Sequence, residues 1–396
     1  MPVGLYISVP FCRSKCSYCN FASDVFSKAV FEKYVSRICY DMEKACTTAE
    51  QMGGRLEDAV DSIYLGGGTP TLLDISQLER LFVTISQNFE VSSNAEITVE
   101  CAPGTLTAQL VEALCRRGVN RVSLGVQSFV DREAASVGRL HNRQKILDDI
   151  VRLRSAGISN ISLDLIAGLP HQTAESWQFS LDQAIATGVP HLSVYMLEVD
   201  EDSRLGRELI AGGSRYHAHT VPDDDLTADL YLVACDRLDQ AGLQQYEISN
   251  FARAGCESRH NLKYWSRQPY LGFGVDAHSM LPAIASDPIE AVRFSTADSL
   301  ENYMVGGALK RTPVERKAAL EETFFLGLRM NHGVDLQSVA AEFGEESVQF
   351  LAAGIADLVE AGLLERELDR IRLTQRGRLV SNEIFERFLS SPQPVV

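Results

Sequence analysis

A group of three cysteines close to the start of the chain is the feature that most constrains this protein. The segment FCRSKCSYCNF, residues 11–21, holds Cys12, Cys16 and Cys19 in the spacing C-x3-C-x2-C. Metal sites built from cysteine commonly use four thiolates, or thiolates together with histidine. Neither a fourth cysteine nor a histidine occurs in the next ten residues, so the group is one ligand short.

Three interpretations of this group compete. A structural zinc site is disfavoured because it requires four ligands. A chance cluster of buried thiols is disfavoured because the flanking Arg13, Ser14, Lys15 and Ser17 predict an exposed loop. An iron–sulfur cluster held by three thiolates leaves its fourth iron open to a small molecule. We therefore favour a cluster with one open iron.

Composition and charge describe an ordinary soluble globular protein. The chain has 396 residues, of which 45% are hydrophobic and 23% charged, enough for two or three domains with a large core. The formal net charge of −16 argues against nucleic acid as a partner, because a phosphate backbone is bound by basic patches.

The start of the chain, MPVGLYISVPFC, has no basic segment followed by an apolar one, and no stretch of about 20 apolar residues occurs anywhere. We therefore expect a cytoplasmic protein, in which thiols stay reduced. Nine cysteines, an odd number, also fit a disulfide framework poorly. Five cysteines are scattered singly and are predicted to be small buried apolar residues: Cys39, Cys46, Cys101, Cys115 and Cys235.

Short β-rich runs alternate with longer stretches of helical periodicity, which predicts βα units around a parallel sheet. All the strand candidates are apolar on both faces, as in a barrel-like or open curved sheet covered by helices. The expected strands are residues 5–9, 62–66, 96–100, 121–126, 161–166 and 192–197. The expected helices are residues 31–52, 75–89, 107–117, 143–155 and 175–187.

The order of the chain changes after residue 223. A helix is expected at 223–242, and a loop containing glycine and proline is expected to run to about residue 290. Residues 300–390 contain short helices, the hairpin-like LLERELDRIRLT and a closing helix, which together look like a winged-helix module. We therefore expect a core at 1–295 and a C-terminal α+β domain at 300–390.

Polar groups follow several of the expected strands. The glycine-rich GGGTP begins at Gly66, Glu100 ends the third strand, Gln127 follows the fourth, and Asp164 lies in the fifth. Each of these side chains could by itself be a helix cap or a surface residue. Because the carboxyl ends of parallel strands meet on one rim, where barrels place their sites, we expect them to line a ligand site together.

The cysteine spacing after a first strand resembles the radical S-adenosylmethionine (SAM) superfamily. The resemblance implies a partial (βα)6 TIM-like barrel, one 4Fe–4S cluster on Cys12, Cys16 and Cys19, and SAM bound to the open iron. It places Tyr18 against the adenine of SAM. Further SAM contacts implied by matching motifs are Tyr6, Gly67, Gly68, Thr69, Glu100, Gln127, Arg139 and Asp164.

Further motifs, among them LYISVPFC, YLGGGTPTLL, RVSLGVQSF and SLDLIAGLPHQT, resemble the oxygen-independent coproporphyrinogen III oxidase group over nearly the whole chain. True coproporphyrinogen dehydrogenases carry a further cysteine where this chain has Phe21, and a histidine where it has Ser8. They also carry an N-terminal arm ahead of the cluster, whereas this chain reaches Cys12 almost at once. These departures weigh against decarboxylation of a coproporphyrinogen.

The segment HNLKYW resembles the H-N-x-x-Y-W motif of the sister group, the HemW-type heme chaperones. The resemblance implies that His260 contacts heme, with Asn261, Tyr264 and Trp265 as weaker candidates. Imidazole is a common axial ligand of heme iron, and flat aromatic rings pack on the macrocycle. The alternative is a histidine–aromatic cluster that closes the barrel. His278, in a glycine-containing segment, is a weaker candidate for a wall of the site.

The sequence therefore favours a protein that binds heme and transfers it to an acceptor, using a 4Fe–4S cluster and SAM. The acceptor is not identified by the sequence and could be associated with a membrane. The alternative is a radical SAM oxidoreductase that acts on a porphyrin or porphyrinogen. Oligomeric state, SAM cleavage and the number of SAM molecules are not determined by these residues.

Overall fold

The computed structural model describes residues 1–198, 200–284 and 288–389. A curved sheet runs through the molecule in the order β12-β11-β10-β9-β1-β2-β3-β4-β5-β6-β8-β7. Its central strands are parallel, as predicted, so their carboxyl ends lie at one edge. These strands are β1 (Val3–Val9), β2 (Ala59–Gly67), β3 (Glu90–Cys101), β4 (Arg121–Gln127), β5 (Asn160–Ala167) and β6 (His191–Met196).

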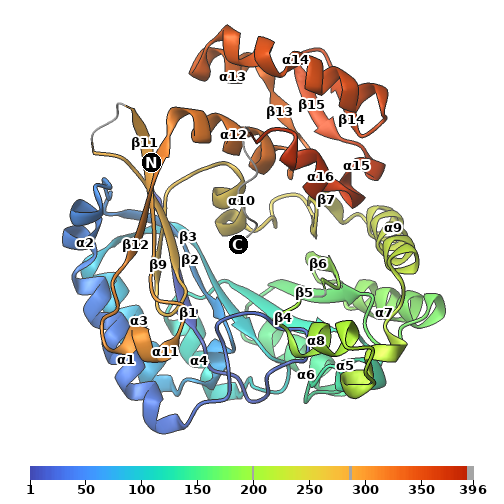
Figure 1. The fold of residues 1–396 in the computed structure, drawn as a ribbon. Coiled ribbons are helices and arrows are strands. Elements are labelled where there is room, and N and C mark those ends of the chain that lie inside the picture. Colours follow the sequence, from blue (N-terminus) through green and yellow to red (C-terminus); the bar gives the residue numbers. More distant parts are fainter. Residues whose placement is uncertain (199, 285–287, 390–396) are drawn as a thin grey trace.

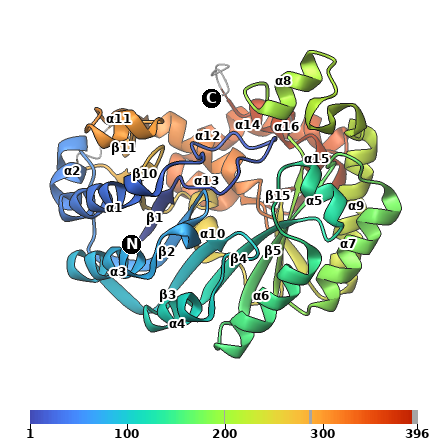
Figure 2. The same cartoon turned by 90° about the horizontal axis from the view of Figure 1, so that it is seen from below.

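Helices cover the outer side of this sheet, as Figures 1 and 2 show. The longer helices α3, α4 and α6 each bury an apolar stripe, and most of the helices begin at a side-chain cap such as Asp74, Thr107 or Asn142. The helices are α1 (Lys28–Glu43), α2 (Ala45–Met52), α3 (Ile75–Asn88), α4 (Ala108–Arg116), α5 (Asp131–Ser136), α6 (Arg143–Ser155), α7 (Ala174–Ala186), α8 (Arg204–Ile210) and α9 (Asp224–Gln240), with 3-10 turns at Pro70–Leu72 and Arg215–Thr220.

Two expectations about secondary structure were wrong. The single helix expected at 31–52 is broken at Lys44, which leaves the helical conformation between α1 and α2. The loop expected to run to about residue 290 instead adds strands to the sheet beside β1, because tertiary pairing rather than local periodicity decides these short segments. These strands are β9 (Tyr270–Phe273), β10 (His278–Pro282), β11 (Ile289–Ser295) and β12 (Lys310–Glu315).

At the other edge of the sheet, the short strands β7 (Gln244–Glu247) and β8 (Asn250–Ala252) pair antiparallel beside β6. Helix α10 (Arg259–Trp265) follows them and contacts both β2 and α12. In Figure 1, α10 lies on the side of the barrel toward the C-terminal module. The short helix α11 (Leu300–Met304) lies near α1.

The C-terminal module has its own apolar core and a three-stranded sheet in the order β13-β15-β14. The hairpin expected from LLERELDRIRLT forms as β14 and β15. The predicted fold class, a partial barrel with an α+β C-terminal domain, is confirmed. The division near residue 300 stays a prediction, and β12 extends the main sheet beyond it. The module contains α12 (Arg316–Gly327), β13 (Val334–Asp335), α13 (Leu336–Phe343), α14 (Glu345–Glu360), β14 (Leu364–Glu367), β15 (Arg370–Leu373), α15 (Gln375–Leu379) and α16 (Ser381–Glu386).

The singly placed cysteines only partly follow the prediction of burial. Cys39 and Cys101 are buried, and Cys115 and Cys235 are half-buried. Cys46 is exposed on α2, so the prediction was wrong there. Among the helices of the described residues, none has the length and apolar character needed to cross a membrane.

The packing of α7 on α9 provides a test of the fold. Trp177 is fully buried, and its indole N–H donates to the carbonyl of Leu230 at 2.7 Å. Trp177→Phe removes this hydrogen bond and leaves a small void, so we expect it to lower the free energy of unfolding by about 2 kcal/mol. Urea unfolding followed by circular dichroism measures this change. Phe179→Leu, on the half-exposed side of α7, is the control and should change the free energy by less than about 0.5 kcal/mol. Equal effects of the two variants would contradict the packing described here.

Candidate functional site

A cavity of about 700 Å³ occupies the interior of the barrel. It extends from the loop after β1 to α10 and the C-terminal module. Nearly all of the predicted cluster and SAM residues line it, although they come from separate strands and loops. These lining residues are Cys12, Cys16, Tyr18, Cys19, Gly67, Gly68, Thr69, Glu100, Gln127, Arg139 and Asp164.

Tyr6 is the one predicted SAM residue outside this lining. It lies on β1 and is only half-buried by its neighbours. A Cβ atom placed on Gly67 would lie 3.4 Å from the Tyr6 hydroxyl, so this phenol sits directly beside the glycine strand end. The structure therefore brings Tyr6 next to the predicted site without exposing it on the cavity wall.

The loop that carries the cysteines is held on several sides by backbone hydrogen bonds. The Cys12 N–H donates to the Asp24 carbonyl at 3.0 Å, and the Thr69 N–H donates to the Phe11 carbonyl at 2.8 Å. Farther along, Ser17 N–H donates to the Val137 carbonyl at 3.1 Å. Ser17 is buried, so the expectation that all flanking polar residues are exposed was wrong for it. These backbone hydrogen bonds position the loop that carries the thiols.

Burial and one neighbouring cation shape the environment of the three thiols. Burial is the main cause that raises the pKa of the Cys12 and Cys19 thiols, so a metal that binds them must displace protons. The Arg139 guanidinium lies 3.7 Å from the Cys16 sulfur. In the part of the chain that the structure describes, no three His, Cys, Asp or Glu side chains converge as around a single ion.

Two other potential ligands that line the cavity are engaged elsewhere. The Nε2 atom of His141 lies 3.1 Å from the Val126 carbonyl, and the Cys101 thiol is directed at the Val99 carbonyl at 3.8 Å. Burial lowers the pKa of His141 to about 4, so its imidazole is neutral at pH 7. The soft donors left on the loop are three thiols, which fits an iron–sulfur cluster with an open iron.

The glycine strand end after β2 is constrained by close backbone contacts. Gly67 has a φ of 97°, a conformation that favours glycine. A Cβ atom on Gly68 would lie 2.8 Å from the carbonyl oxygens of both Val9 and Phe11. Only glycine allows β2 to pass this close to the cysteine loop, so the loop and the strand end form one unit.

Two carboxyl groups face the interior of the barrel. Glu100 accepts from the Tyr64 hydroxyl at 2.8 Å and from the Gly67 N–H at 3.2 Å. Asp164 accepts from the Ser123 hydroxyl at 3.0 Å. Burial raises the pKa of both, that of Glu100 to about 7. Two carboxyl groups and a cationic amino-acid ligand such as SAM are electrostatically complementary.

Gln127 and Arg139 complete the rim. Gln127 has a φ of 65° at an irregularity in the pairing of β4 with β5, a strained conformation of the kind that often marks a ligand site. The Arg139 guanidinium donates to the Gly125 carbonyl, inside the barrel. Without the family resemblance, Arg139 would have been placed on a solvated helix end. The structure instead points it at the cavity.

Helix α10 divides the HNLKYW motif between two environments. His260 is 1% exposed and outside the cavity lining. Its Nδ1 lies 2.9 Å from the Ser62 hydroxyl and its Nε2 lies 2.9 Å from the Tyr264 hydroxyl. Asn261 and Trp265, on the neighbouring stripe of α10, line the cavity.

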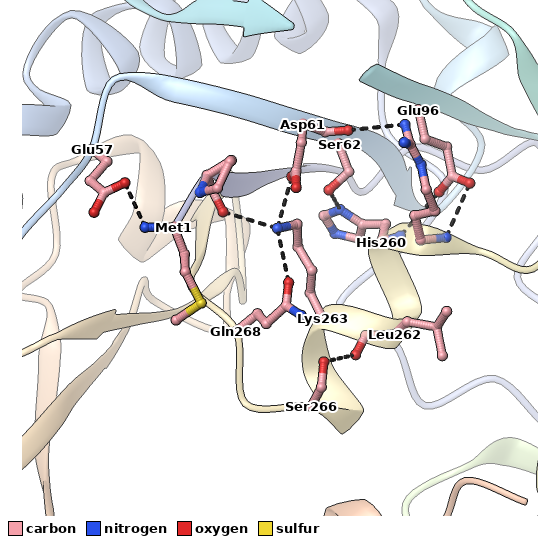
Figure 3. Close-up of polar contacts among 12 residues, drawn as sticks. Met1, Glu57, Asp61, Ser62, Glu96, His260, Leu262, Lys263, Ser266 and Gln268 are labelled. Carbon is pink, nitrogen blue, oxygen red and sulfur yellow. Dashed lines mark hydrogen bonds and ion pairs between the residues drawn. The ribbon is translucent and has the colours of Figure 1, made fainter. Parts of the chain in front are cut away.

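Figure 3 shows how α10 is attached to the amino-terminal ends of the strands. The carboxylate of Glu96 accepts from the backbone N–H groups of Arg259 and His260, at the start of the helix. Lys263 contacts Asp61 at 2.8 Å and donates to the Pro2 carbonyl at 2.9 Å. The helix therefore closes the end of the barrel opposite the cysteine loop, and both nitrogens of His260 are occupied in this conformation.

His278 is exposed on β10 and does not line the cavity, so the structure does not bring it to the site. Sequence reasoning missed other lining residues, notably Tyr195, Arg329 and Arg378. The two arginines belong to the C-terminal module, and no local motif marks them. Only tertiary packing brings them to the barrel.

Comparisons with known proteins agree with this geometry. A model of the radical SAM superfamily matches residues 6–184, and a model of the HemN C-terminal domain matches residues 314–380. The chain is 34% identical to the heme chaperone HemW of Bacillus subtilis, over 97% of this chain and 98% of that protein. It is 30% identical to the heme chaperone HemW of Escherichia coli, over 98% of both chains.

A solved structure shows a similar fold. Coproporphyrinogen III oxidase (HemN) from Escherichia coli, described as a radical SAM enzyme, superposes with a TM-score of 0.82 at 24% identity. The match covers 98% of this chain and 90% of that one.

The buried Glu100 predicts a pH-dependent stability. Its pKa is about 7 in the folded protein and near the ordinary value of 4.5 when unfolded. Between these values the folded state binds more protons, so the free energy of unfolding falls as pH rises. Glu100→Gln removes this pH-dependent loss of stability. The free energy of unfolding of the variant minus that of the parent should therefore rise by up to about 3 kcal/mol between pH 4.5 and 7.5.

Urea unfolding of the cofactor-free protein across this pH range measures the difference. Glu112→Gln, at an exposed position of α4, is the control and should give a difference that hardly varies with pH. A Glu100→Gln difference that is equally flat would contradict burial of a proton-binding carboxyl at this position.

Proposed function

The chain belongs to the HemW family within the radical SAM superfamily, and we propose that it is a heme chaperone that binds heme and transfers it to an acceptor protein. The observation that carries this proposal is likeness to heme chaperones over nearly the whole chain. The barrel cavity supports it, because it continues beyond the predicted SAM contacts to the aromatic Trp265. Apolar space with a few polar groups is typical of cofactor sites.

The cofactors of a radical SAM protein are a 4Fe–4S cluster and SAM. When bound, they supply an open coordination site on iron and an electron for the sulfonium group. In our proposal Cys12, Cys16 and Cys19 hold the cluster. Gly67 and Gly68 allow close approach of the ligand, and Glu100 and Asp164 complement its positive charge.

The remaining predicted contacts surround the same space. Tyr18 lies on the cysteine loop and offers an aromatic face for adenine. The hydroxyl of Tyr6 lies beside Gly67 at the end of β2. Thr69, Gln127 and Arg139 contribute polar groups on the rim. These roles share one structural basis, because the predicted cluster and SAM residues that line the cavity lie on central strands or on the loops that follow them.

We place heme in the part of the cavity bounded by α10 and the C-terminal module. Asn261 and Trp265 face it directly. His260 can serve as a ligand of heme iron only if its hydrogen bonds to Ser62 and Tyr264 open and α10 turns toward the cavity. Burial lowers the pKa of His260 to about 3, so the imidazole is neutral and chemically able to bind iron.

Coproporphyrinogen oxidation is not favoured as an alternative. The most similar curated relatives described above are heme chaperones, whereas the coproporphyrinogen oxidase HemN shares only the fold at 24% identity. At the mouth of the cavity, Phe21 stands where the dehydrogenases that this chain resembles carry a further cysteine. The cytoplasmic location and the nature of the acceptor stay predictions of the sequence.

Replacement of the three loop cysteines by alanine tests the cluster. After anaerobic reconstitution we expect about four irons per parent chain and almost none in the Cys12→Ala, Cys16→Ala, Cys19→Ala triple variant. Iron and sulfide analysis measures this loss. Cys46→Ala, at an exposed thiol outside the cavity, is the matched control and should keep the full load. An undiminished iron load in the triple variant would exclude this cluster site.

Heme titration of the reconstituted full-length chain tests the proposed function. We expect a saturable shift of the heme absorbance band, which His260→Ala abolishes. Tyr264→Phe removes one of the hydrogen bonds that hold the imidazole closed, so it should tighten heme binding about fivefold. Absence of saturable binding to the parent would refute the chaperone proposal. If both variants bind like the parent, His260 only closes the barrel.

A further inference from the structure

Two arginines on the cavity wall make no side-chain hydrogen bond to a carboxylate of the described residues. Arg329 follows α12, and its nearest carboxylate, that of Glu247, lies 4.0 Å away. The side chain of Arg378, on α15, makes neither a hydrogen bond nor an ion pair with the residues that the structure describes. By contrast, Arg267 and Arg293 of the neighbouring strands and loops share Glu322. Both cavity arginines are half-buried, where an unpaired charge is costly.

The side chain of Arg329 is held in place by a neighbouring aromatic ring. Its guanidinium lies 4.4 Å above the centre of the Trp265 indole ring, a cation–π contact that fixes its orientation. The buried Trp265 indole nitrogen and the Arg329 Nε have no hydrogen-bond partner in the described part of the chain. Unsatisfied buried donors of this kind cost about 1–3 kcal/mol each, which is a reason to look for a missing acceptor.

The same wall includes acidic and amide groups. Glu247 is 1% exposed, and its Oε1 accepts from the side chain of Asn250. Its Oε2 lies 4.0 Å from Arg329, too far for a hydrogen bond, and has no hydrogen-bond partner among the described residues. Burial is the main cause that raises the pKa of Glu247, and the nearby Arg329 acts in the opposite direction. Glu383 is exposed and lies at the edge of the lining. Arg329 and Arg378 therefore remain available to an anionic ligand.

The chemistry of this wall fits carboxylates. A guanidinium binds a carboxylate through two parallel hydrogen bonds, and two guanidiniums on one wall suit a ligand with two carboxylates on one edge. Heme is a flat apolar ring with two propionates on a single edge. Its ring also suits the aromatic Trp265 beneath Arg329.

We propose that Arg329 and Arg378 bind the propionates of heme, so that the carboxylate edge lies against the C-terminal module and the opposite edge points toward the cysteine loop. This inference rests on the proposed function and adds the orientation of the ligand. It gives the C-terminal module a direct part in holding heme. It also explains why two cations face the interior of a protein whose net charge is −16.

A comparison of heme with its dimethyl ester, in which both propionates are neutral, tests the proposal. Titrations of the reconstituted full-length protein should show heme bound at least about tenfold more tightly than the ester. Arg329→Gln and Arg378→Gln should each weaken heme binding by about tenfold and leave ester binding unchanged. The corresponding lysine variants, which keep the charge, should recover part of the affinity.

The matched control is Arg376→Gln. Arg376 lies two residues before Arg378 on α15, is exposed and does not line the cavity, so this variant makes the same change of charge outside the site. It should bind heme like the parent. Equal affinity of the parent for heme and its ester overturns the proposal, as does an Arg376→Gln loss as large as that of Arg378→Gln.

The proposal and the function on which it rests fail in different ways. No binding of either heme or its ester overturns the proposed function itself. Binding of both with equal affinity overturns only the role of the arginines. If a glutamine variant does not fold, the two ligands are still compared on the parent and on the lysine variants, and that comparison decides.

Discussion

The contact between the end of β2 and the loop after β1 is the constraint on which the site depends. Gly68 packs against the carbonyl oxygens of Val9 and Phe11 with no room for a side chain. The Gly68 and Thr69 N–H groups donate to these same carbonyls. The cysteine loop is therefore attached to the sheet by its backbone, and the geometry of the thiols follows from the parallel pairing of two strands.

Helix α10 has two stripes that lie in different environments. One stripe of this helix carries His260 and Tyr264. His260 is hydrogen-bonded to Tyr264 and to Ser62, which lies near the amino-terminal end of β2. The next stripe, with Asn261 and Trp265, faces the cavity. Because residues four apart share a helix face, a single motif can both close the barrel and line its interior. Any ligand that engages His260 must first work against this closure.

Burying the polar residues inside the barrel lowers the stability of the fold unless a bound ligand interacts with them. Glu100 and Asp164 are desolvated carboxyls with raised pKa values, and Gln127 holds a strained backbone conformation. On the opposite wall, the Arg329 guanidinium lies 4.0 Å from the carboxylate of Glu247. The placement of these groups at two ends of one cavity is consistent with two different ligands, one cationic and one anionic.

The sequence by itself determined the loop of three cysteines, the six βα units and the polar residues at strand ends, because spacing and periodicity along the chain are local properties. Glu100, Gln127 and Asp164 were predictable since parallel strands must end on one rim. The side of α10 that faces the cavity was not, because it depends on contacts with residues nearly 200 positions away, such as Ser62. Arg329 and Arg378 likewise reach the barrel only through the docking of the C-terminal module. Long-range packing decided these features, and no local pattern of residues encodes it.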